Sequence, residues 1–340
     1  MKTFSSLKWL IAICGILALA GYKSYQQWQE WMEPASSQPS YEIVEVKKGA
    51  SFRQIALELE NRGIIRSRDA FFILAWRRDE LSSIKAGEYK LSPSMRPEEI
   101  LQILVEGRTV QHLVTIPEGY NRFQIAKVLD DAGLIEKEAF LKASSDKAIL
   151  KAQEIPADTA EGYLFPESYM LPRKTSAADA VMMFTSQFWK IWKDNGFQER
   201  AKELGKDVHY IVTLASIVEM EAAVPEEKPI IASVFWNRLK KGMPLQADPT
   251  VKYGLLVEKG IKRKRLSKKD LRTPTAYNTY LLPGLPKGPI SNPGLLSLKA
   301  TLYPAETDYL FFVAKGKRRH KFSKTLKEHN RAVRKYILKR

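Results

Sequence analysis

The sequence predicts an α+β protein in which a transmembrane helix and a small βα module precede a larger mixed domain. Three observations lead to this prediction: an apolar run near the N-terminus, short alternating stretches typical of strands, and a duplicated pattern of strand, turn and helix. With 340 residues, the chain can bury a sizeable core and divide into two or more units.

The apolar run covers residues 9–25, which we expect to form a transmembrane anchor. Counted from Phe4 to Tyr25, a helix would rise about 33 Å, enough to cross a hydrocarbon core of about 30 Å. Residues 26–40 are rich in proline and serine, so they predict a linker that lets the body stand off the bilayer.

Charge around the apolar run predicts the orientation of the anchor. Lys2 and Lys8 come before the run, so the positive-inside rule places residues 1–8 in the cytoplasm and the large body outside it. The alternative is a cleaved signal peptide, because residues 18–20 have the small-x-small form of a cleavage site. Both interpretations place the body across the membrane.

The overall charge limits the classes of partner. Lys and Arg number 55 against 38 Asp and Glu, a net charge of +17, which favours polyanionic partners. The basic run at 262–269 would suit a nucleic-acid-binding arm, but a body outside the cytoplasm excludes nucleic acid, so we interpret the run as a solvated surface loop. The only cysteine is Cys14 and the four histidines show no metal-ligand spacing, so we expect no metal and no cofactor.

A strand-turn-helix pattern occurs twice. Residues 41–46 alternate as a strand, and 51–62 have helical spacing closed by glycine. The matching positions are Gly49 and Gly119, Gln54 and Gln124, Ile55 and Ile125, Ala56 and Ala126, Leu59 and Leu129, Gly63 and Gly133, and Ile65 and Ile135. We predict a small module at 41–109 and a larger domain at 110–340, with the second copy, 110–145, docked on that domain.

Glu219 is the leading candidate for catalysis. Residues 210–218 leave no continuous polar face, so a helix there would be buried nearly all round. A buried carboxyl group without a cationic partner favours its neutral form, which a general acid needs. The competing interpretation is a solvent-exposed glutamate, or one paired with Arg238 or Lys240. Glu221 lies roughly 200° further round the helix and should face the other way.

The sequence resembles the endolytic murein transglycosylases, the YceG-like family of membrane-anchored bacterial enzymes that cut peptidoglycan glycan strands. The resemblance runs from about Tyr41 to the C-terminus and is carried by four blocks: ASIVE-x-E, ASVFWNRL, GMPLQADPTVKYG and TPTAYNTYLLPGLPKGPISNPG. It implies that Glu219 protonates the glycosidic oxygen and then, as carboxylate, takes the proton from the muramic acid's own 6-hydroxyl. The product is a 1,6-anhydro end within a nascent strand, which terminates elongation.

The resemblance also implies the surroundings of Glu219. Amide and hydroxyl dipoles would steady an oxocarbenium-like transition state, and further polar groups would line the cleft. The implied substrate-binding residues are Asn237, Gln246, Tyr277, Asn278, Glu221, Asp248 and Glu161. For Asp248, a cap on Thr250 or an ion pair with Arg238 is an equally open interpretation.

The family implies a LysM-like module at 41–109, a fold associated with N-acetylated glycans, where Trp76 and Tyr89 are the available aromatic residues. It also implies peptidoglycan as partner, peptidoglycan synthases as further candidate partners, and a single-pass protein of the inner membrane. Two other functions stay open. One is a hydrolytic muramidase using Glu219 with Asp248. The other is a non-catalytic wall-binding scaffold.

Overall fold

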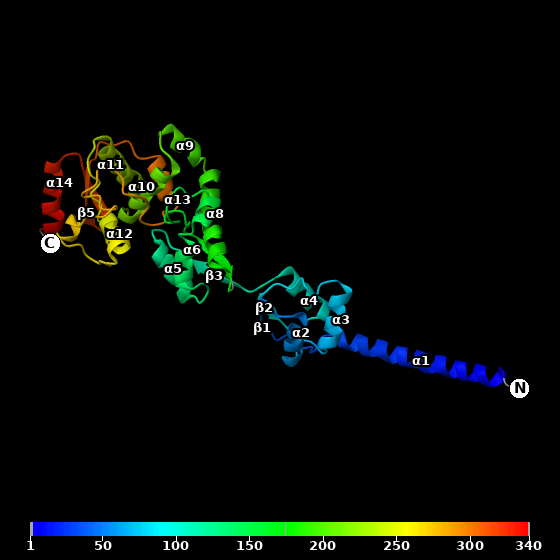
Figure 1. Cartoon of the computed structure of the whole chain (residues 1–340). Helices are drawn as coiled ribbons and strands as arrows, with labels where there is room; N and C mark the ends of the chain where they lie inside the picture. Colours follow the sequence, from blue (N-terminus) through cyan, green and yellow to red (C-terminus); the bar gives the residue numbers. More distant parts are fainter. Residues whose placement is uncertain (1–2, 174, 339–340) are drawn as a thin grey trace. The chain divides into compact units, whose positions relative to one another are not determined.

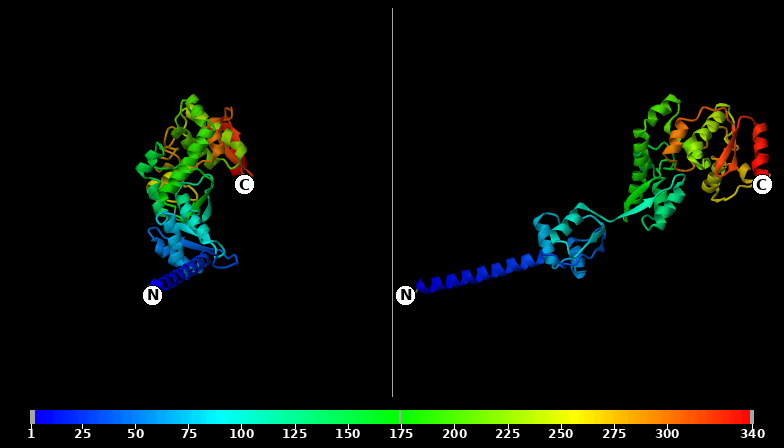
Figure 2. Two further views of the ribbon diagram at one scale, coloured as in Figure 1. Left: turned by 90° about the vertical axis from the view of Figure 1, so that its right-hand side faces the viewer. Right: turned by 180° about the vertical axis from the view of Figure 1, so that it is seen from behind.

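The computed structural model describes residues 3–173 and 175–338, and the chain divides into two compact units. Unit 1 is Met1–His112 with Leu171–Lys174, and unit 2 is Leu113–Met170 with Thr175–Arg340. Helices dominate both units, and the described strands pair in twos, so the α+β class is observed (Figures 1 and 2). The pairs are β1 (Glu42–Val46) with β2 (Gly87–Leu91), β3 (Gln111–Thr115) with β4 (Ser168–Pro172), and β5 (Phe311–Gly316) with β6 (Arg319–Ser323).

Helix α1 (Thr3–Trp31) includes the predicted anchor at 9–25. Apolar side chains along it are exposed, among them Trp9, Ile16 and Tyr22. Within the described part of the chain, no helix combines the length and apolar character needed to cross a membrane. Of the predicted cytoplasmic N-terminus, residues 1 and 2 and the side chains of 3–8 lie outside what is described.

The predicted linker at 26–40 is partly helical and packs on unit 1, so the prediction of a free spacer is wrong. Met32 is 4% exposed and joins the hydrophobic core together with Trp28. The Ser36 N–H donates to the carbonyl of Pro93 at 2.9 Å. Burial of the apolar side chains of this segment in the core stabilises it in a fixed position. This stabilisation outweighs the tendency of its prolines and serines to form a free linker.

The rest of unit 1 is a three-helix module on a two-stranded sheet. Strands β1 and β2 are antiparallel, with Glu42 opposite Leu91 and Val46 opposite Gly87. Helices α2 (Phe52–Asn61), α3 (Arg68–Arg77) and α4 (Pro97–Glu106) complete its core. Tyr89 is fully buried and its hydroxyl donates to the carbonyl of Lys85 at 2.6 Å, so it cannot serve as an exposed sugar platform.

The duplicated sequence pattern folds in the same way locally in both copies. Helix α2 begins at a capping box of Ser51 and Gln54, and α5 (Arg122–Asp131) begins at a capping box of Asn121 and Gln124. Each helix is followed by a glycine in the left-handed region, at φ 66° for Gly63 and 64° for Gly133. The same sequence signals therefore start and stop both helices.

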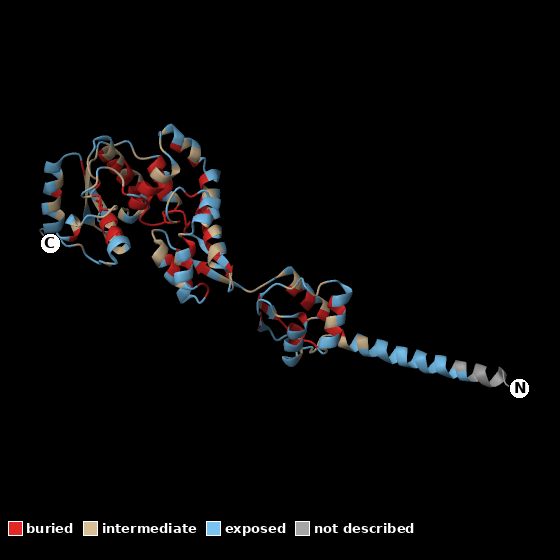
Figure 3. Ribbon diagram, viewed as in Figure 1, coloured by how far each residue is buried: buried red, intermediate tan, exposed pale blue. Residues whose placement is uncertain are grey.

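Unit 2 is built around α10 (Val208–Glu221), whose residues 211–218 are all buried. Figure 3 shows buried residues concentrated on this helix. It packs against α11 (Lys228–Lys240) and α13 (Leu295–Leu302). The remaining helices of the unit are α6 (Lys137–Ala143), α7 (Lys147–Ala152), α8 (Ala177–Asp194), α9 (Phe197–Glu203), α12 (Asp248–Lys259) and α14 (Leu326–Val333), with short turns η1 (Pro225–Glu227), η2 (Asp270–Arg272) and η3 (Arg334–Leu338).

The β5-β6 hairpin is tied to the turn that precedes α11. The buried carboxylate of Glu227 lies 2.7 Å from His320 Nδ1 and accepts the His320 backbone N–H at 3.1 Å. This contact fixes the start of α11, whose first residue is Lys228.

Candidate active site

Glu219 lies in the last turn of α10, and its side chain is only 8% exposed. Lys228 Nζ lies 3.0 Å from both of its carboxylate oxygens and is itself 6% exposed at the side chain. The predicted absence of a cationic partner is therefore wrong. The turn η1 brings the first residue of α11 back against the end of α10, so Lys228, and neither Arg238 nor Lys240, pairs with Glu219.

The N-terminus of α13 supplies further donors to Glu219. The Gly294 N–H donates to Oε2 at 3.1 Å, and the Ser297 hydroxyl donates to the same oxygen at 2.6 Å. The positive end of the α13 dipole adds to this field. Because every partner is a hydrogen-bond donor, the arrangement suits a carboxylate. The apolar surroundings predicted for Glu219 are only part of its environment.

A second carboxylate, which the sequence did not single out, reaches the same lysine. Glu118 lies in the turn between β3 and α5, and its Oε2 is 3.6 Å from Lys228 Nζ. Its side chain is 48% exposed, unlike that of Glu219. The next residue, Gly119, has φ 76° and lies against the Glu219 side chain. The sequence feature that could have pointed to Glu118 is the glycine turn that precedes the helix in each copy of the duplicated pattern.

The surroundings of Glu221 disfavour its charged form, although the cations Lys252 and Arg238 partly offset this effect. Burial, together with the negative charge of Asp248, raises the pKa of Glu221 to about 7. Asp248 accepts a hydrogen bond from the Tyr280 hydroxyl at 2.7 Å. It does not cap Thr250, whose hydroxyl donates to Ala247, and Arg238 is instead bonded to backbone carbonyls, those of Pro244, Leu245 and Leu310.

Gln246 is exposed and held in a strained backbone conformation. Its φ of 52° lies in the left-handed region that non-glycine residues avoid. Its N–H donates to the carbonyl of Thr279 at 3.0 Å, which holds the loop in place. An exposed amide on a strained, fixed loop is consistent with the predicted contact to substrate.

Glu161 is a buried structural acid. Its side chain accepts the Arg122 N–H at 3.1 Å, the Tyr253 hydroxyl at 2.8 Å and the Asn292 amide at 2.9 Å. Burial outweighs these bonds and raises the pKa of Glu161 to about 7. Tyr277 belongs to the same region, with its ring 5.0 Å from that of Tyr253. With a residue exposure of 2%, Glu161 is enclosed by protein and holds the start of α5 in place.

Two residues predicted to line the cleft, Asn237 and Asn278, instead bind backbone carbonyls. The Asn237 amide donates to the carbonyls of Thr307 at 2.7 Å and Tyr309 at 3.1 Å. The buried Asn278 amide donates to the carbonyls of Leu271 at 3.1 Å and Thr273 at 2.8 Å. These bonds occupy both N–H groups of each amide, so in the described part of the chain the two side chains bind backbone carbonyls and not Glu219.

The predicted site residues therefore fall into three groups. Glu219 forms a centre with Lys228, Gly294 and Ser297, and Glu118 adjoins it. Glu221, Asp248 and Gln246 form a second group around the start of α12, and Glu161 with Tyr277 forms a third. Within residues 3–173 and 175–338, no three His, Cys, Asp or Glu side chains gather as metal ligands would.

Comparison with known proteins places the chain in a family. The model of the YceG-like family matches residues 44–335. The chain is 36% identical over 315 residues to an endolytic murein transglycosylase of Bacillus subtilis (strain 168), covering 86% of this chain and 84% of the relative. An endolytic murein transglycosylase of Streptococcus pneumoniae serotype 2 (strain D39) is 28% identical over 82% of this chain, which spans only 55% of that longer relative.

A solved structure agrees with these sequence relationships. The crystal structure of a YceG-like protein from Listeria monocytogenes superposes with a TM-score of 0.58 at 34% identity, covering 86% of this chain and 99% of the other. The match takes in most of both described units. The chain belongs to the YceG-like family.

Proposed function

We propose that this protein is an endolytic murein transglycosylase, which cuts the bond between N-acetylmuramic acid and N-acetylglucosamine within a peptidoglycan strand. The family and the names of its relatives support this activity. One structural observation carries the assignment to Glu219: its nearly buried carboxylate is fixed by Lys228, Gly294 and Ser297. Cutting leaves a 1,6-anhydro end, so the strand can grow no further.

The chemistry follows from the state of the Glu219 carboxylate. The carboxyl group gives its proton to the glycosidic oxygen as the bond to C1 breaks, and as a fixed anion it then stabilises the positive charge that develops on the muramic acid ring. It then accepts the proton of the sugar's 6-hydroxyl while O6 bonds to C1. The nucleophile is supplied by the substrate, so no activated water is required.

The hydrolytic alternative needs two carboxylates flanking the bond, and Asp248 was the candidate second group. Asp248 accepts a hydrogen bond from Tyr280, and its negative charge raises the pKa of Glu221. These contacts place Asp248 with Glu221 and not with Glu219. Lysis is therefore favoured over hydrolysis by Glu219 with Asp248.

The test is to incubate the full-length protein in detergent with purified glycan strands and to identify the new ends by mass spectrometry. We expect 1,6-anhydro ends from the wild type and a rate lower by about 10²–10⁴-fold from Glu219→Gln. Glu138→Gln, at an exposed glutamate of α6, is the matched control and should cut normally. Reducing ends would mean hydrolysis, and no new ends from the wild type would leave a scaffold role. Cutting that survives Glu219→Gln would mean that another residue is catalytic.

We also propose that residues 9–25 of α1 anchor the protein in the inner membrane, with residues 1–8 in the cytoplasm and the body outside. The finding that no helix is able to span a membrane covers only the described residues, and the side chains of residues 3–8, 10 and 11 lie outside them. The uncharged run at 9–22, the flanking lysines and the exposed apolar side chains of α1 support this placement. An anchored enzyme would meet strands as they are made, so peptidoglycan synthases are proposed partners. Protease treatment of spheroplasts tests the orientation, because an external body would be degraded without lysis.

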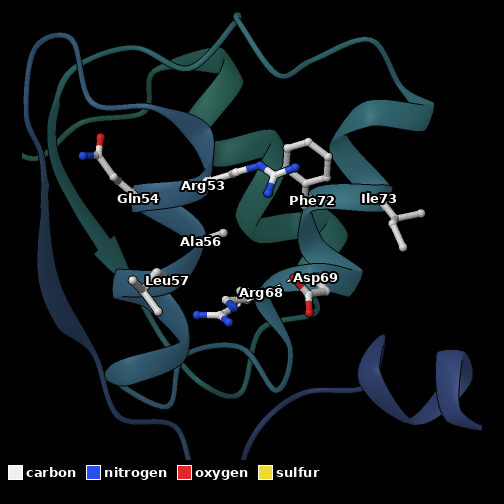
Figure 4. A pocket seen from close by; sticks show the side chains of 8 residues that line it. All are labelled: Arg53, Gln54, Ala56, Leu57, Arg68, Asp69, Phe72 and Ile73. Atoms are coloured by element: carbon white, nitrogen blue, oxygen red, sulfur yellow. Dashed lines mark ion pairs between the residues drawn. The ribbon is translucent and has the colours of Figure 1, made fainter.

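We propose that residues 41–109 of unit 1 form the LysM-like module and hold glycan in a groove between α2 and α3. The groove has a volume of about 460 Å³, and Figure 4 shows Arg53 reaching from α2 towards the ring of Phe72 on α3. The guanidinium lies 4.7 Å from the ring centroid. Ile73 also lines the groove, and Trp76 is exposed on the same helix. Exposed apolar and aromatic side chains of this kind suit the apolar faces of sugar rings. Trp76→Ala should reduce retention of the protein on glycan strands.

A further inference from the structure

Glu118 shares two partners with Glu219. The first is Lys228, whose ammonium lies 3.0 Å from each Glu219 oxygen and 3.6 Å from Glu118 Oε2. The second is Gly294, which donates its N–H to Glu219. A Cβ atom added to Gly294 would lie 1.8 Å from Glu118 Oε1, so the Glu118 carboxyl group lies directly over this glycine.

The backbone of the Glu118 turn is held firmly. The Gly119 N–H donates to the carbonyl of Asn292 at 2.9 Å, and the Asn292 N–H donates to the carbonyl of Tyr120 at 2.9 Å. The Asn292 amide adds a third bond to the same carbonyl at 2.8 Å. These bonds fix the turn that carries Glu118 to the segment that leads into α13. The N-terminus of α13 supplies the donors that bind Glu219.

The duplicated pattern indicates that the carboxylate is not needed to form this turn. Where the second copy has Glu118 before Gly119, the first copy has Lys48 before Gly49. Both glycines are left-handed, at φ 82° and 76°, and both turns lead into a capped helix. A lysine serves the fold equally well, so the glutamate at 118 calls for a different explanation.

We propose that Glu118 is a second catalytic residue, the general acid that protonates the leaving oxygen, while Glu219 acts as the base. This inference rests on the proposed transglycosylase function and divides between two carboxyl groups the two roles otherwise given to Glu219. The different surroundings support the division. Glu219 is surrounded by donors that suit an anion, whereas Glu118 is half-exposed and open to a glycan strand.

The proposed step balances in protons and bonds. Glu118 gives its proton to O4 of N-acetylglucosamine as the C1–O4 bond breaks, and Glu219 takes the proton of O6 as the C1–O6 bond forms. The proton then stands on Glu219 and Glu118 is ionised. After the products leave, Glu219 releases its proton to solvent and half-exposed Glu118 takes one from solvent, which restores the starting state.

The experiment compares Glu118→Gln and Glu219→Gln in the full-length protein on two substrates. One is a purified glycan strand, whose leaving group needs a proton. The other is a muramic-acid-terminated oligosaccharide with a 2,4-dinitrophenyl aglycone, which leaves without one. We expect Glu118→Gln to cut glycan about 10²–10⁴-fold more slowly than the wild type but to release dinitrophenolate at the wild-type rate. Glu219→Gln should be slow on both substrates.

Three results would overturn the inference while leaving the proposed function intact. They are a normal rate of glycan cutting by Glu118→Gln, a loss of both activities in that variant, and a rise in KM with kcat unchanged. Thermal unfolding would show whether the variant folds, and Glu138→Gln again serves as control. If the wild type gave no anhydro ends, the proposed function itself would fail, and that result is distinct from the other three.

Discussion

Lys228 Nζ lies at 3.0 Å from both carboxylate oxygens of Glu219, and both side chains are more than nine-tenths buried. Each charge of a buried ion pair stabilises the other, because either charge alone at this position would be buried without solvation or a partner. The pair therefore makes the stability of unit 2 depend on the same two groups that shape the proposed active site.

Lys228→Met should destabilise the protein strongly, by about 3 kcal/mol, because it leaves the Glu219 charge buried without its cation. The measurement is urea unfolding of the full-length protein followed by circular dichroism. Adding Glu219→Gln to Lys228→Met should recover part of the loss, since it removes the orphaned charge. Lys127→Met, at an exposed pair with Asp131, is the control and should leave the unfolding midpoint unchanged. Equal effects at the two lysines would contradict the prediction.

Glu161 should make the protein lose stability as the pH rises from 4.5 towards 7. Its pKa is raised from 4.5 to about 7 in the folded state, so the native protein binds the extra proton between these values. That contribution is fully present below pH 4.5 and is lost as the pH rises through the folded pKa. Between these two pH values, the free energy of unfolding of the wild type should fall by about 3 kcal/mol more than that of Glu161→Gln. Parallel urea titrations that give the same pH slope for both proteins would rule this out.

Gly294→Ala should slow cutting without removing any catalytic group. The new methyl group would lie where Glu118 Oε1 now lies, so it should push that carboxyl group away from Lys228. The Gly294 backbone, at φ −78°, accommodates alanine, so the N–H bond to Glu219 should persist. We expect a rate on glycan strands close to that of Glu118→Gln. A wild-type rate would mean that the position of Glu118 is unimportant.

Gln246→Gly should separate stability from activity. Glycine relieves the left-handed strain at φ 52°, so the free energy of unfolding should be unchanged or rise by about 1 kcal/mol, while loss of the exposed amide should slow cutting. Glu154→Gly offers a matched control, because Glu154 has φ 51° and lies outside the proposed site. The control should gain similar stability and cut normally. If both variants cut equally well, Gln246 has no role in binding substrate.

The sequence was sufficient to predict α10 and the position of Glu219 at its end, because a largely apolar run followed by an acid is a local pattern. It was not sufficient to predict the partners of Glu219. Lys228 is nine residues away across a turn, a spacing that no helical rule covers. Gly294 is 75 residues away and reaches Glu219 only through tertiary packing.

The amide side chains show the same limit. Asn237 and Asn278 lie in the family's blocks, yet a sequence does not reveal whether an amide faces a cleft or a neighbouring carbonyl. In the duplicated pattern, by contrast, the capping residues Ser51 and Asn121 act within one turn of their own helices, so local sequence was enough to place them. Local signals were predictable, and contacts between distant segments were not.

The contacts of Glu219 with Gly294 and Ser297 also bear on how the enzyme is made. A ribosome delivers Glu219 and Lys228 well before it delivers these two donors, so an unfinished chain carries the acid without two of the groups that fix it. Competence to cut arises only once synthesis has passed Ser297 and that segment has folded back. A murein-cutting protein built in this order stays harmless to the wall until the segment that carries Gly294 and Ser297 has been made and placed.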